Sequence, residues 1–398
     1  MKMYLNHCGI VCALGDNHHD IKQHLLHEAS TGVLPTDAWS PGRVLPLGEV
    51  SSPLPDVSHL PISMHSRNNQ LALAALAQIR TAVDNVVARF GADRVGIVIG
   101  TSTSGIANTE TALREYSEQG HLPASFHYAQ QEMSSPAEML AFELGISGPA
   151  YVHSSACSSS AKAMASAARL IKMGLCDAVL TGGVDTLCAF TVAGFSALES
   201  VSAERCNPLS ANRNGINIGE GAAFFLMTAE PVDRGANIML CGWGESSDGH
   251  HISAPDPAGG GARLAIAQAL QRAGIAASDI DYINLHGTAT LQNDAMEARV
   301  IHDLFGDTVP VSSTKPFTGH TLGAAAAIEA ALCWLAMQDD NAQGCLPPHL
   351  WDGIADAQLP VLCLATSSKP LGRPLRWALS NSFAFGGSNA TLILGRAV

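Results

Sequence analysis

Cys157 has the residue type and the local setting of a nucleophile. The segment from Tyr151 reads YVHSSACSSSAKAMASAARLIKMG, a short β-rich run that leads through serines into an Ala-rich helix ending before Gly174. At a helix N-terminus, unpaired N–H groups and a partial positive charge lower a thiol pKa and stabilise a developing oxyanion. On this segment alone, a buried structural cysteine beside an N-capping serine explains the residues equally well.

Two histidines stand in turns far along the chain from this cysteine. His286 follows the β-rich run DYINLHGTAT, and His320 lies in VSSTKPFTGHTLGAAAAIEA with Lys315 five residues before it. A lone histidine at a strand end is more often a hydrogen-bonded structural residue. The separations are too long for local pairing, so only a tertiary fold brings Cys157, His286 and His320 together.

A glycine turn near the C-terminus is flanked by phenylalanines. The segment SNSFAFGGSNA contains Phe383, Phe385, Gly386 and Gly387. Paired glycines permit positive φ and a close approach of backbone to ligand. An ordinary tight turn between two strands is the simpler explanation for this segment taken by itself.

Together, ACSSS, HGTAT, KPFTGHTLGAA and NSFAFGGSN occur in the order found in the Cys-His-His condensing enzymes of the thiolase superfamily. The chain resembles in particular the elongating β-ketoacyl-acyl carrier protein synthases. Further similar segments are NPLSANRNGINIGEGA, SSDGHHISAPDPAGGGA and the first strand, so the resemblance covers essentially the whole chain.

The resemblance implies a division of roles among these residues. Cys157 accepts an acyl group from a carrier-protein thioester. The backbone N–H groups of Cys157 and Phe385 form the oxyanion hole for that transfer. His286 and His320 hold the malonyl thioester carbonyl while carbon dioxide leaves, and the carbanion then attacks the acyl-Cys157 thioester.

Other site residues follow from the same resemblance. Lys315 and Glu297 support the histidines electrostatically, and Glu297 is the expected partner of a buried Lys315. A purely structural ion pair is the alternative. The remaining implied residues are Phe383, Gly386 and Gly387 in the gating turn, Thr288, Thr290 and His251 toward the substrate, and Arg67 and Arg205 toward the acidic carrier protein.

Several residues depart from the family pattern. Asn214 replaces the commoner aspartate, Ile216 and Asn217 replace an aromatic–aliphatic pair, and Ala384 and Ser388 replace glycine and threonine in the gating turn. None of these positions is Cys157, His286 or His320. The departures predict a specialised synthase, such as one that builds unsaturated or polyene chains.

The resemblance implies a β-ketoacyl-ACP synthase, an acyltransferase that decarboxylates malonyl-ACP and joins the product to an acyl chain by Claisen condensation in fatty acid, polyene or polyketide synthesis. The alternative is a catalytically silent chain-length-factor-like subunit, a class marked by replacement of the cysteine. Initiating synthases and thiolases use asparagine or a second cysteine in place of one histidine. The expected partners are acyl carrier protein and a homodimer mate, or a related ketosynthase or chain-length factor in a heterodimer.

The order of β-rich and Ala-rich segments predicts an α/β fold. The resemblance implies a thiolase-like core in which two related α/β halves pack as α-β-α-β-α layers. We expect the halves to span residues 1–235, with the cysteine, and 236–398, with both histidines. One helix is expected over residues 67–90, and others over residues 158–173, 260–273 and 323–337.

Composition excludes several other classes. A formal charge of −13 without a basic run argues against nucleic-acid binding. The longest apolar stretch, residues 324–337, is too short to span a bilayer. Ten scattered cysteines without a CxxC pair favour a reducing cytoplasm. Neither a cofactor nor a metal is expected, and the adjacent His250 and His251 lack metal-ligand spacing.

Overall fold

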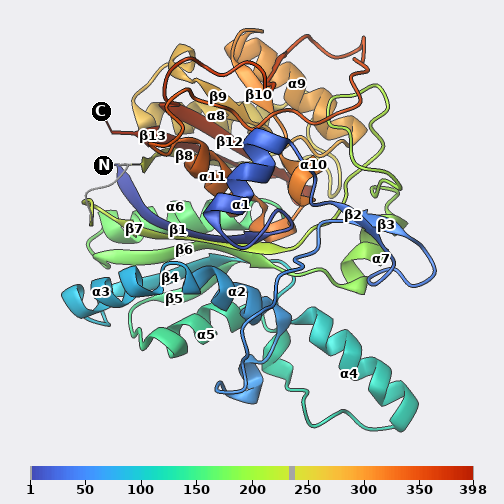
Figure 1. The fold of residues 1–398 in the computed structure, drawn as a ribbon, viewed down its shortest axis with the longest axis vertical. Coiled ribbons are helices and arrows are strands. Elements are labelled where there is room, and N and C mark those ends of the chain that lie inside the picture. Colours follow the sequence, from blue (N-terminus) through green and yellow to red (C-terminus); the bar gives the residue numbers. More distant parts are fainter. Residues whose placement is uncertain (1, 233–237, 398) are drawn as a thin grey trace.

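A mixed sheet dominates the computed structural model, which describes residues 2–232 and 238–397 (Figure 1). Within these ranges eleven strands lie in the order β11-β10-β9-β12-β13-β8-β1-β7-β6-β4-β5. Their bounds are β1 Met3–Cys12, β4 Val95–Gly100, β5 Ala150–His153, β6 Ala178–Asp185, β7 Gly221–Thr228, β8 Ile238–Ser247, β9 Tyr282–Asn284, β10 Pro310–Ser312, β11 Cys363–Leu364, β12 Trp377–Ala384 and β13 Ser388–Arg396. The predicted boundary between residues 235 and 236 lies outside the described residues.

The strand order is repeated on the two sides of the β1–β8 junction. Strands β5, β4 and β6 are parallel, and β7 and β1 continue antiparallel. Strands β10, β9 and β12 are likewise parallel, and β13 and β8 continue antiparallel. The junction itself consists of the pairs Met3–Leu240 and Tyr4–Met239. The predicted internal repeat is therefore present as two strand sets of one topology.

Helices cover both strand sets and separate them (Figure 1). The central helices α6 and α11 contact each other; α6 packs on β4 and β6, and α11 packs on β7 and β12. Helices α2, α3 and α5 lie on the outer face of the first set, and α8 and α9 lie beyond the second. The bounds are α2 Arg67–Ala77, α3 Arg80–Phe90, α5 Ser135–Leu144, α6 Ser159–Lys172, α8 Gly260–Ala273, α9 Leu291–Phe305 and α11 Ala325–Ala336. These layers confirm the predicted α-β-α-β-α core.

Smaller elements complete the fold at the edges of the layers. Strands β2 and β3 pair antiparallel in a small sheet of their own. Helix α4 projects from the body beside α7 (Figure 1). The bounds are α1 His18–Lys22, β2 Leu34–Thr36, β3 Leu45–Leu47, α4 Ile106–Gln119, α7 Ala189–Ala197 and α10 Lys315–Thr318.

Burial explains the local sequence of the layers. All residues of β6, β7 and β12 are buried, as expected for strands covered by helices on both faces. Helix α11 is buried on every side, which its nearly uniform apolar sequence requires. At Gly100, a Cβ would lie 2.3 Å from the backbone nitrogen of Ser160, so glycine is needed for β4 to approach the start of α6.

The prediction of one helix over residues 67–90 is wrong in one respect. The segment forms two helices, α2 and α3, with a 79° bend between them. The side chain of Gln78 explains the break. Its Nε2 donates to the Ile10 carbonyl at 2.7 Å, and its Oε1 accepts from the Ile10 amide at 3.1 Å. No single helix in the described ranges is long and apolar enough to cross a membrane. The bent pair of α2 and α3 reaches the necessary length and apolar composition only when the two helices are taken together.

Candidate active site

Cys157 lies in a tight turn between β5 and α6. Ala156, immediately before it, has φ +51°, a conformation that is uncommon for a residue with a Cβ and that marks a constrained turn. Serine side chains hold this turn: the Ser155 amide donates to Ser159 Oγ at 2.8 Å, and Ser159 Oγ donates to the Ala156 carbonyl at 2.6 Å. The predicted position of Cys157 at the start of the central helix is confirmed.

The Cys157 sulfur is buried and faces two backbone N–H groups. Burial raises the pKa of the thiol to about 11, while Lys315 and the N–H groups of Phe385 and Cys157 act in the opposite direction. The prediction of a lowered thiol pKa is therefore wrong for this closed state, because desolvation outweighs the N–H groups. Both N–H groups nevertheless lie beside the sulfur, from where they can donate to the carbonyl oxygen of an acyl group bound to it.

His320 lies beside the nucleophile. Its Nε2 is 3.1 Å from Cys157 Sγ. Its Nδ1 accepts a hydrogen bond from the Leu322 amide at 3.2 Å, so the proton of a neutral imidazole resides on Nε2. Burial, followed by the charge of Lys315, holds the His320 pKa well below its usual range. A neutral His320 therefore donates toward the sulfur and is not placed to act as its base.

His286 is held through its backbone from two sides. Its amide donates to Glu297 Oε1 at 2.8 Å, and its carbonyl accepts from Lys315 Nζ at 2.5 Å. The His286 ring lies edge-on to that of His320, with centroids 5.4 Å apart. Burial and then Lys315 keep the His286 pKa well below its usual range, so both imidazoles are neutral donors or acceptors.

The predicted pairing of Glu297 with Lys315 is wrong. Lys315 Nζ pairs instead with Glu329 Oε1 at 2.5 Å, and both side chains are buried. Glu297 uses its second oxygen to accept from the Gly287 amide at 2.8 Å. The two buried carboxylates therefore have separate roles, since Glu329 balances the lysine charge and Glu297 ties down the turn that carries His286.

Glu329 and Asn217 support the site but were not predicted from the sequence. Glu329 stands alone in an apolar helix, and a lone carboxylate in such a run is a signal for a buried ionic partner. Asn217 is fully buried, and its carbonyl accepts from the His320 amide at 2.6 Å. Its Oδ1 accepts from the Cys206 amide at 2.6 Å, a contact for which the sequence contains no local signal.

A small cavity of about 50 Å³ opens at Cys157. Its polar lining includes Thr288 and Thr290, whose hydroxyls lie 2.8 Å apart. Other lining residues are His286, His320, Phe383, Phe385, Phe195, Ile216 and Ser253. One water needs about 10–15 Å³ of such volume, so this cavity holds only a few waters and must widen to admit a long acyl chain.

The gating turn joins β12 to β13. Gly386 and Gly387 have φ of +79° and +74°, so the predicted positive φ is confirmed. The Gly386 amide donates to the Ile252 carbonyl at 2.7 Å, and the Asp248 amide donates to the Gly387 carbonyl at 2.8 Å. The turn is therefore held against residues 248–252 with the Phe385 ring over the cavity, where it contacts Phe195 at 5.8 Å between ring centroids.

Three implied residues lie away from this cavity. His251 is exposed, and its Nδ1 accepts from the Ser253 amide at 3.2 Å. Arg67 pairs with the buried Glu220, with Nε 3.0 Å from Oε2, so its guanidinium belongs to a structural ion pair instead of a free basic surface. Arg205 is half-buried.

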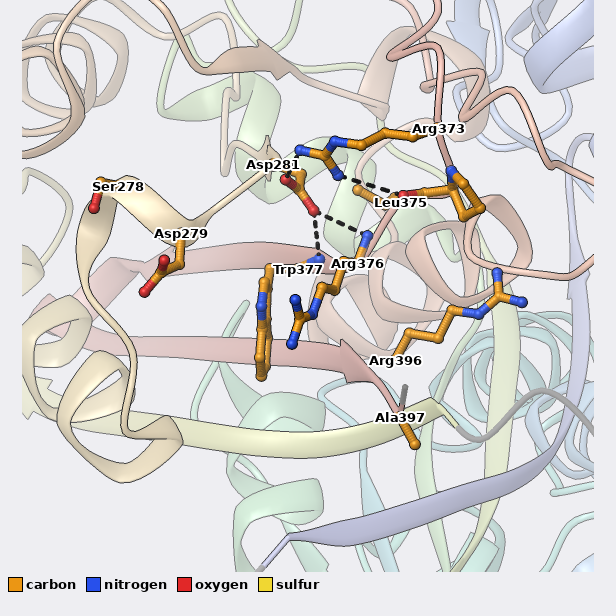
Figure 2. Close-up of a pocket in the computed structure, with 10 residues that line it drawn as sticks. Ser278, Asp279, Asp281, Arg373, Leu375, Arg376, Trp377, Arg396 and Ala397 are labelled. Atoms are coloured by element: carbon orange, nitrogen blue, oxygen red, sulfur yellow. Dashed lines mark hydrogen bonds and ion pairs between the residues drawn. The ribbon is translucent and has the colours of Figure 1, made fainter.

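A larger hollow of about 610 Å³ lies at the opposite end of β12 and β13 from the gating turn (Figure 2). Its polar groups satisfy one another: Asp281 accepts from Arg373 at 2.5 Å and from the Arg376 and Trp377 amides at 2.9 Å. None of the predicted site residues lines it. Volume alone therefore does not locate the reactive centre of this molecule.

Cys157, His286 and His320 also have the residue types of a metal site. Their potential ligand atoms lie within 4.8 Å of one another. A zinc ligand must offer an unprotonated nitrogen to the ion. The Nε2 of His320 carries its proton toward the shared space, however, because Nδ1 accepts from the Leu322 amide. The group is better suited to hydrogen bonding a substrate carbonyl than to holding an ion.

Fold and site together define a condensing enzyme of the Cys-His-His class. The α/β core is repeated two-fold, the cysteine lies at the N-terminus of a central helix, and two neutral histidines and converging N–H groups surround it. Family models agree with this class. Residues 63–231 match the beta-ketoacyl synthase N-terminal domain, and residues 238–350 match the beta-ketoacyl synthase C-terminal domain. The chain belongs to the beta-ketoacyl synthase family.

Individual relatives support the same family assignment. The chain is 36% identical over 309 residues to nodulation protein E of Rhizobium meliloti, covering 75% of each chain. It is 32% identical over 316 residues to 3-oxoacyl-[acyl-carrier-protein] synthase 2 of Staphylococcus aureus, covering 76% of this chain and 77% of that one. Among solved structures, it is similar to a chain of the complex of the ketosynthase ApeO with its chain length factor ApeC from Xenorhabdus doucetiae. That match has 45% identity, a TM-score of 0.93, and coverage of 100% and 98%.

The predicted fold, family and enzyme class are therefore confirmed. The protein is an acyl-transferring condensing enzyme with a thiolase-like fold, of the kind that acts in fatty acid and polyketide synthesis.

Proposed function

We propose that Cys157 accepts an acyl group from an acyl carrier protein and that His286 and His320 activate malonyl carrier protein for condensation with it. The observation that carries this proposal is the convergence of Cys157 Sγ and the ring nitrogens of both histidines within 4.8 Å. The bond that forms first is a thioester between Sγ and the acyl carbon, and the carrier thiol leaves.

Loading uses the backbone dipoles at Cys157. When the acyl carbonyl is attacked, its oxygen gains negative charge beside the N–H groups of Cys157 and Phe385. The thiol proton must leave as the carrier thiolate is expelled, so the carrier sulfur is its final acceptor. His320 stabilises the transient thiolate through its Nε2 proton, which supports a role other than that of a general base.

Decarboxylation uses the two neutral imidazoles. Loss of carbon dioxide from the malonyl group leaves an enolate whose oxygen carries the developing charge, and two N–H donors lower the energy of that state. Low pKa values of both histidines keep them neutral, so protonation of the carbanion by an imidazolium does not compete with condensation. The carbanion attacks the Cys157 thioester, and the sulfur leaves as the new carbon–carbon bond forms.

We further propose a dimer with a second chain of the same fold, either a copy of this chain or a related subunit. Strand β5, next to the nucleophile turn, is the last strand of the sheet, and its free edge is available for pairing. The similar Xenorhabdus complex contains a ketosynthase and a chain length factor, which favours a heterodimer. All ten cysteines are free thiols, which favours the cytoplasm as the setting.

The test is acylation of the purified protein by a panel of acyl carrier proteins that bear saturated or polyene chains. Intact mass is measured for the protein alone and with candidate partner subunits. We expect an adduct on Cys157 and its absence from Cys157→Ala. A protein that accepts no acyl group in any combination would instead support the silent chain-length-factor-like role.

A further inference from the structure

Lys162 lies on α6, five residues after Cys157, and its side chain reaches the gating turn. Lys162 Nζ donates to Ser388 Oγ at 2.5 Å. Ser388 is the first residue of β13 and directly follows Gly387. The central helix that follows the nucleophile turn is thus bonded to the segment that carries Phe385.

The contact continues into the nucleophile turn. Ser388 Oγ lies 2.9 Å from Ser158 Oγ, and Ser158 Oγ donates to the Ser155 carbonyl at 2.8 Å. Because a hydroxyl has one proton, Ser158 must accept from Ser388, which in turn accepts from Lys162. Each proton in this Lys162–Ser388–Ser158 chain therefore points toward the turn that holds Cys157.

Lys162 has an environment that packing alone does not explain. Its side chain is half-buried, and in residues 2–232 and 238–397 no carboxylate forms an ion pair with it. Burial and then the nearby Arg169 lower the pKa of Lys162, while Arg169 itself pairs with Glu245. A partly desolvated cation without a carboxylate is costly, and its hydrogen bond to Ser388 is the compensation that the described residues provide.

The chain bears on the oxyanion site because Ser388 is three residues from Phe385. On the other side of the turn, Gly386 and Asn389 are bonded to Ile252 and Asp248, at 2.7 Å in each case. We propose that Lys162 is a positioning residue which, through Ser388 and Ser158, sets the distance between the N–H groups of Phe385 and Cys157 and so accelerates acyl transfer. This inference rests on the proposed role of Cys157 as the acyl acceptor.

The experiment measures single-turnover acylation of the full-length protein by an acyl carrier protein, by rapid quench and intact mass. Lys162→Met and Ser388→Ala should each lower the saturating acylation rate about 10-fold, less than outright loss of an oxyanion donor, with little change in the half-saturating carrier concentration. The double variant should be no slower than either single variant, because both remove one chain. Lys162→Arg and Ser388→Thr should keep most of the rate.

Lys172→Met is the matched control, since it removes an exposed lysine from the end of the same helix and should leave the rate unchanged. Wild-type rates in Lys162→Met, or a double variant slowed by the product of the single effects, would overturn the proposal. If Lys162→Met fails to fold, equal rates for Ser388→Ala and Ser388→Thr would overturn it. Absence of any adduct on wild-type Cys157 would instead refute the proposed function itself.

Discussion

The two halves of this protein repeat one strand order, yet they hold their reactive groups by different means. In the first half, Cys157 is placed by a turn of serines and faces two uncharged backbone N–H groups, its own and that of Phe385 from the second half. In the second half, His286 depends on the buried charged side chains of Glu297 and Lys315. One architecture thus supports a site built from dipoles and a site built from charges.

The difference predicts different sensitivities. A dipole site depends on distances of a few tenths of an ångström and changes little with pH. A charge site depends on pairing and protonation, because each buried charge is costly once its partner is lost. Variants at Cys157 and at the histidines should therefore separate acyl transfer from malonyl activation, and variants of the buried charges around His286 should also lower stability.

The largest effect is expected at the nucleophile. Cys157→Ala should lower condensation by more than about 10⁴-fold, as removal of a covalent nucleophile does, while decarboxylation of malonyl carrier protein continues. Formation of the β-ketoacyl product is measured by mass spectrometry of the carrier protein. Cys345→Ala, at a partly exposed cysteine outside the site, is the control and should retain full activity. Appreciable product from Cys157→Ala would contradict the role of Cys157 as the nucleophile.

The next effect concerns the histidines. His286→Ala and His320→Ala should each slow malonyl decarboxylation about 10²- to 10³-fold, the usual cost of losing one preorganised donor to a developing oxyanion. Acylation of Cys157 should change by less than about 10-fold, because the backbone N–H groups remain. Release of labelled carbon dioxide and intact mass measure the two steps. Normal decarboxylation with lost acylation would reverse the proposed roles.

The buried ion pair gives a stability effect confined to the second half. Lys315→Met leaves Glu329 buried without its cation and should reduce the free energy of unfolding by about 3–5 kcal/mol. Combining it with Glu329→Leu should restore much of the loss, whereas combining it with Glu297→Gln should not. Urea unfolding measures all three variants. Rescue by Glu297→Gln would show that Glu297, and not Glu329, balances the lysine.

The smallest effect is a pH dependence. Burial raises the pKa of Glu297 to about 7 against the opposing N–H groups of Gly287 and His286. Between its ordinary pKa and about 7 the folded state holds more protons than the unfolded state, so its contribution to stability falls as pH rises. Glu297→Gln should reduce the pH-dependent change in the free energy of unfolding between about pH 4.5 and pH 7 by on the order of 1–3 kcal/mol. An unchanged slope in urea unfolding would contradict the raised pKa.

Local patterns in the sequence predicted an α/β fold and the turns that carry the reactive residues, because buried runs and glycine turns have local causes, whereas the layered core was implied by the family resemblance. The partner of Lys315 was not predictable in this way. Glu297 and Glu329 both lie on helices of the second half, and the choice between them depends on how α9 and α11 pack around α10. The break at Gln78 likewise arises from a bond to β1, which is distant in sequence.

The state of the Cys157 thiol was mispredicted for a related reason. The helix N-terminus is visible in the sequence, but the burial that raises the pKa to about 11 depends on the tertiary structure around the sulfur. The proton position of His320, by contrast, is set locally, because its Nδ1 accepts from the Leu322 amide two residues away. The burial that lowers the pKa values of both histidines depends on tertiary packing.

The central claim is that Cys157 and the two histidines perform separable steps. The most direct test measures acyl-adduct formation and carbon dioxide release side by side in Cys157→Ala and His286→Ala. We predict that Cys157→Ala forms no adduct but releases carbon dioxide, and that His286→Ala forms the adduct but releases almost none. Loss of both steps in each variant, with both proteins folded, would contradict the division of labour.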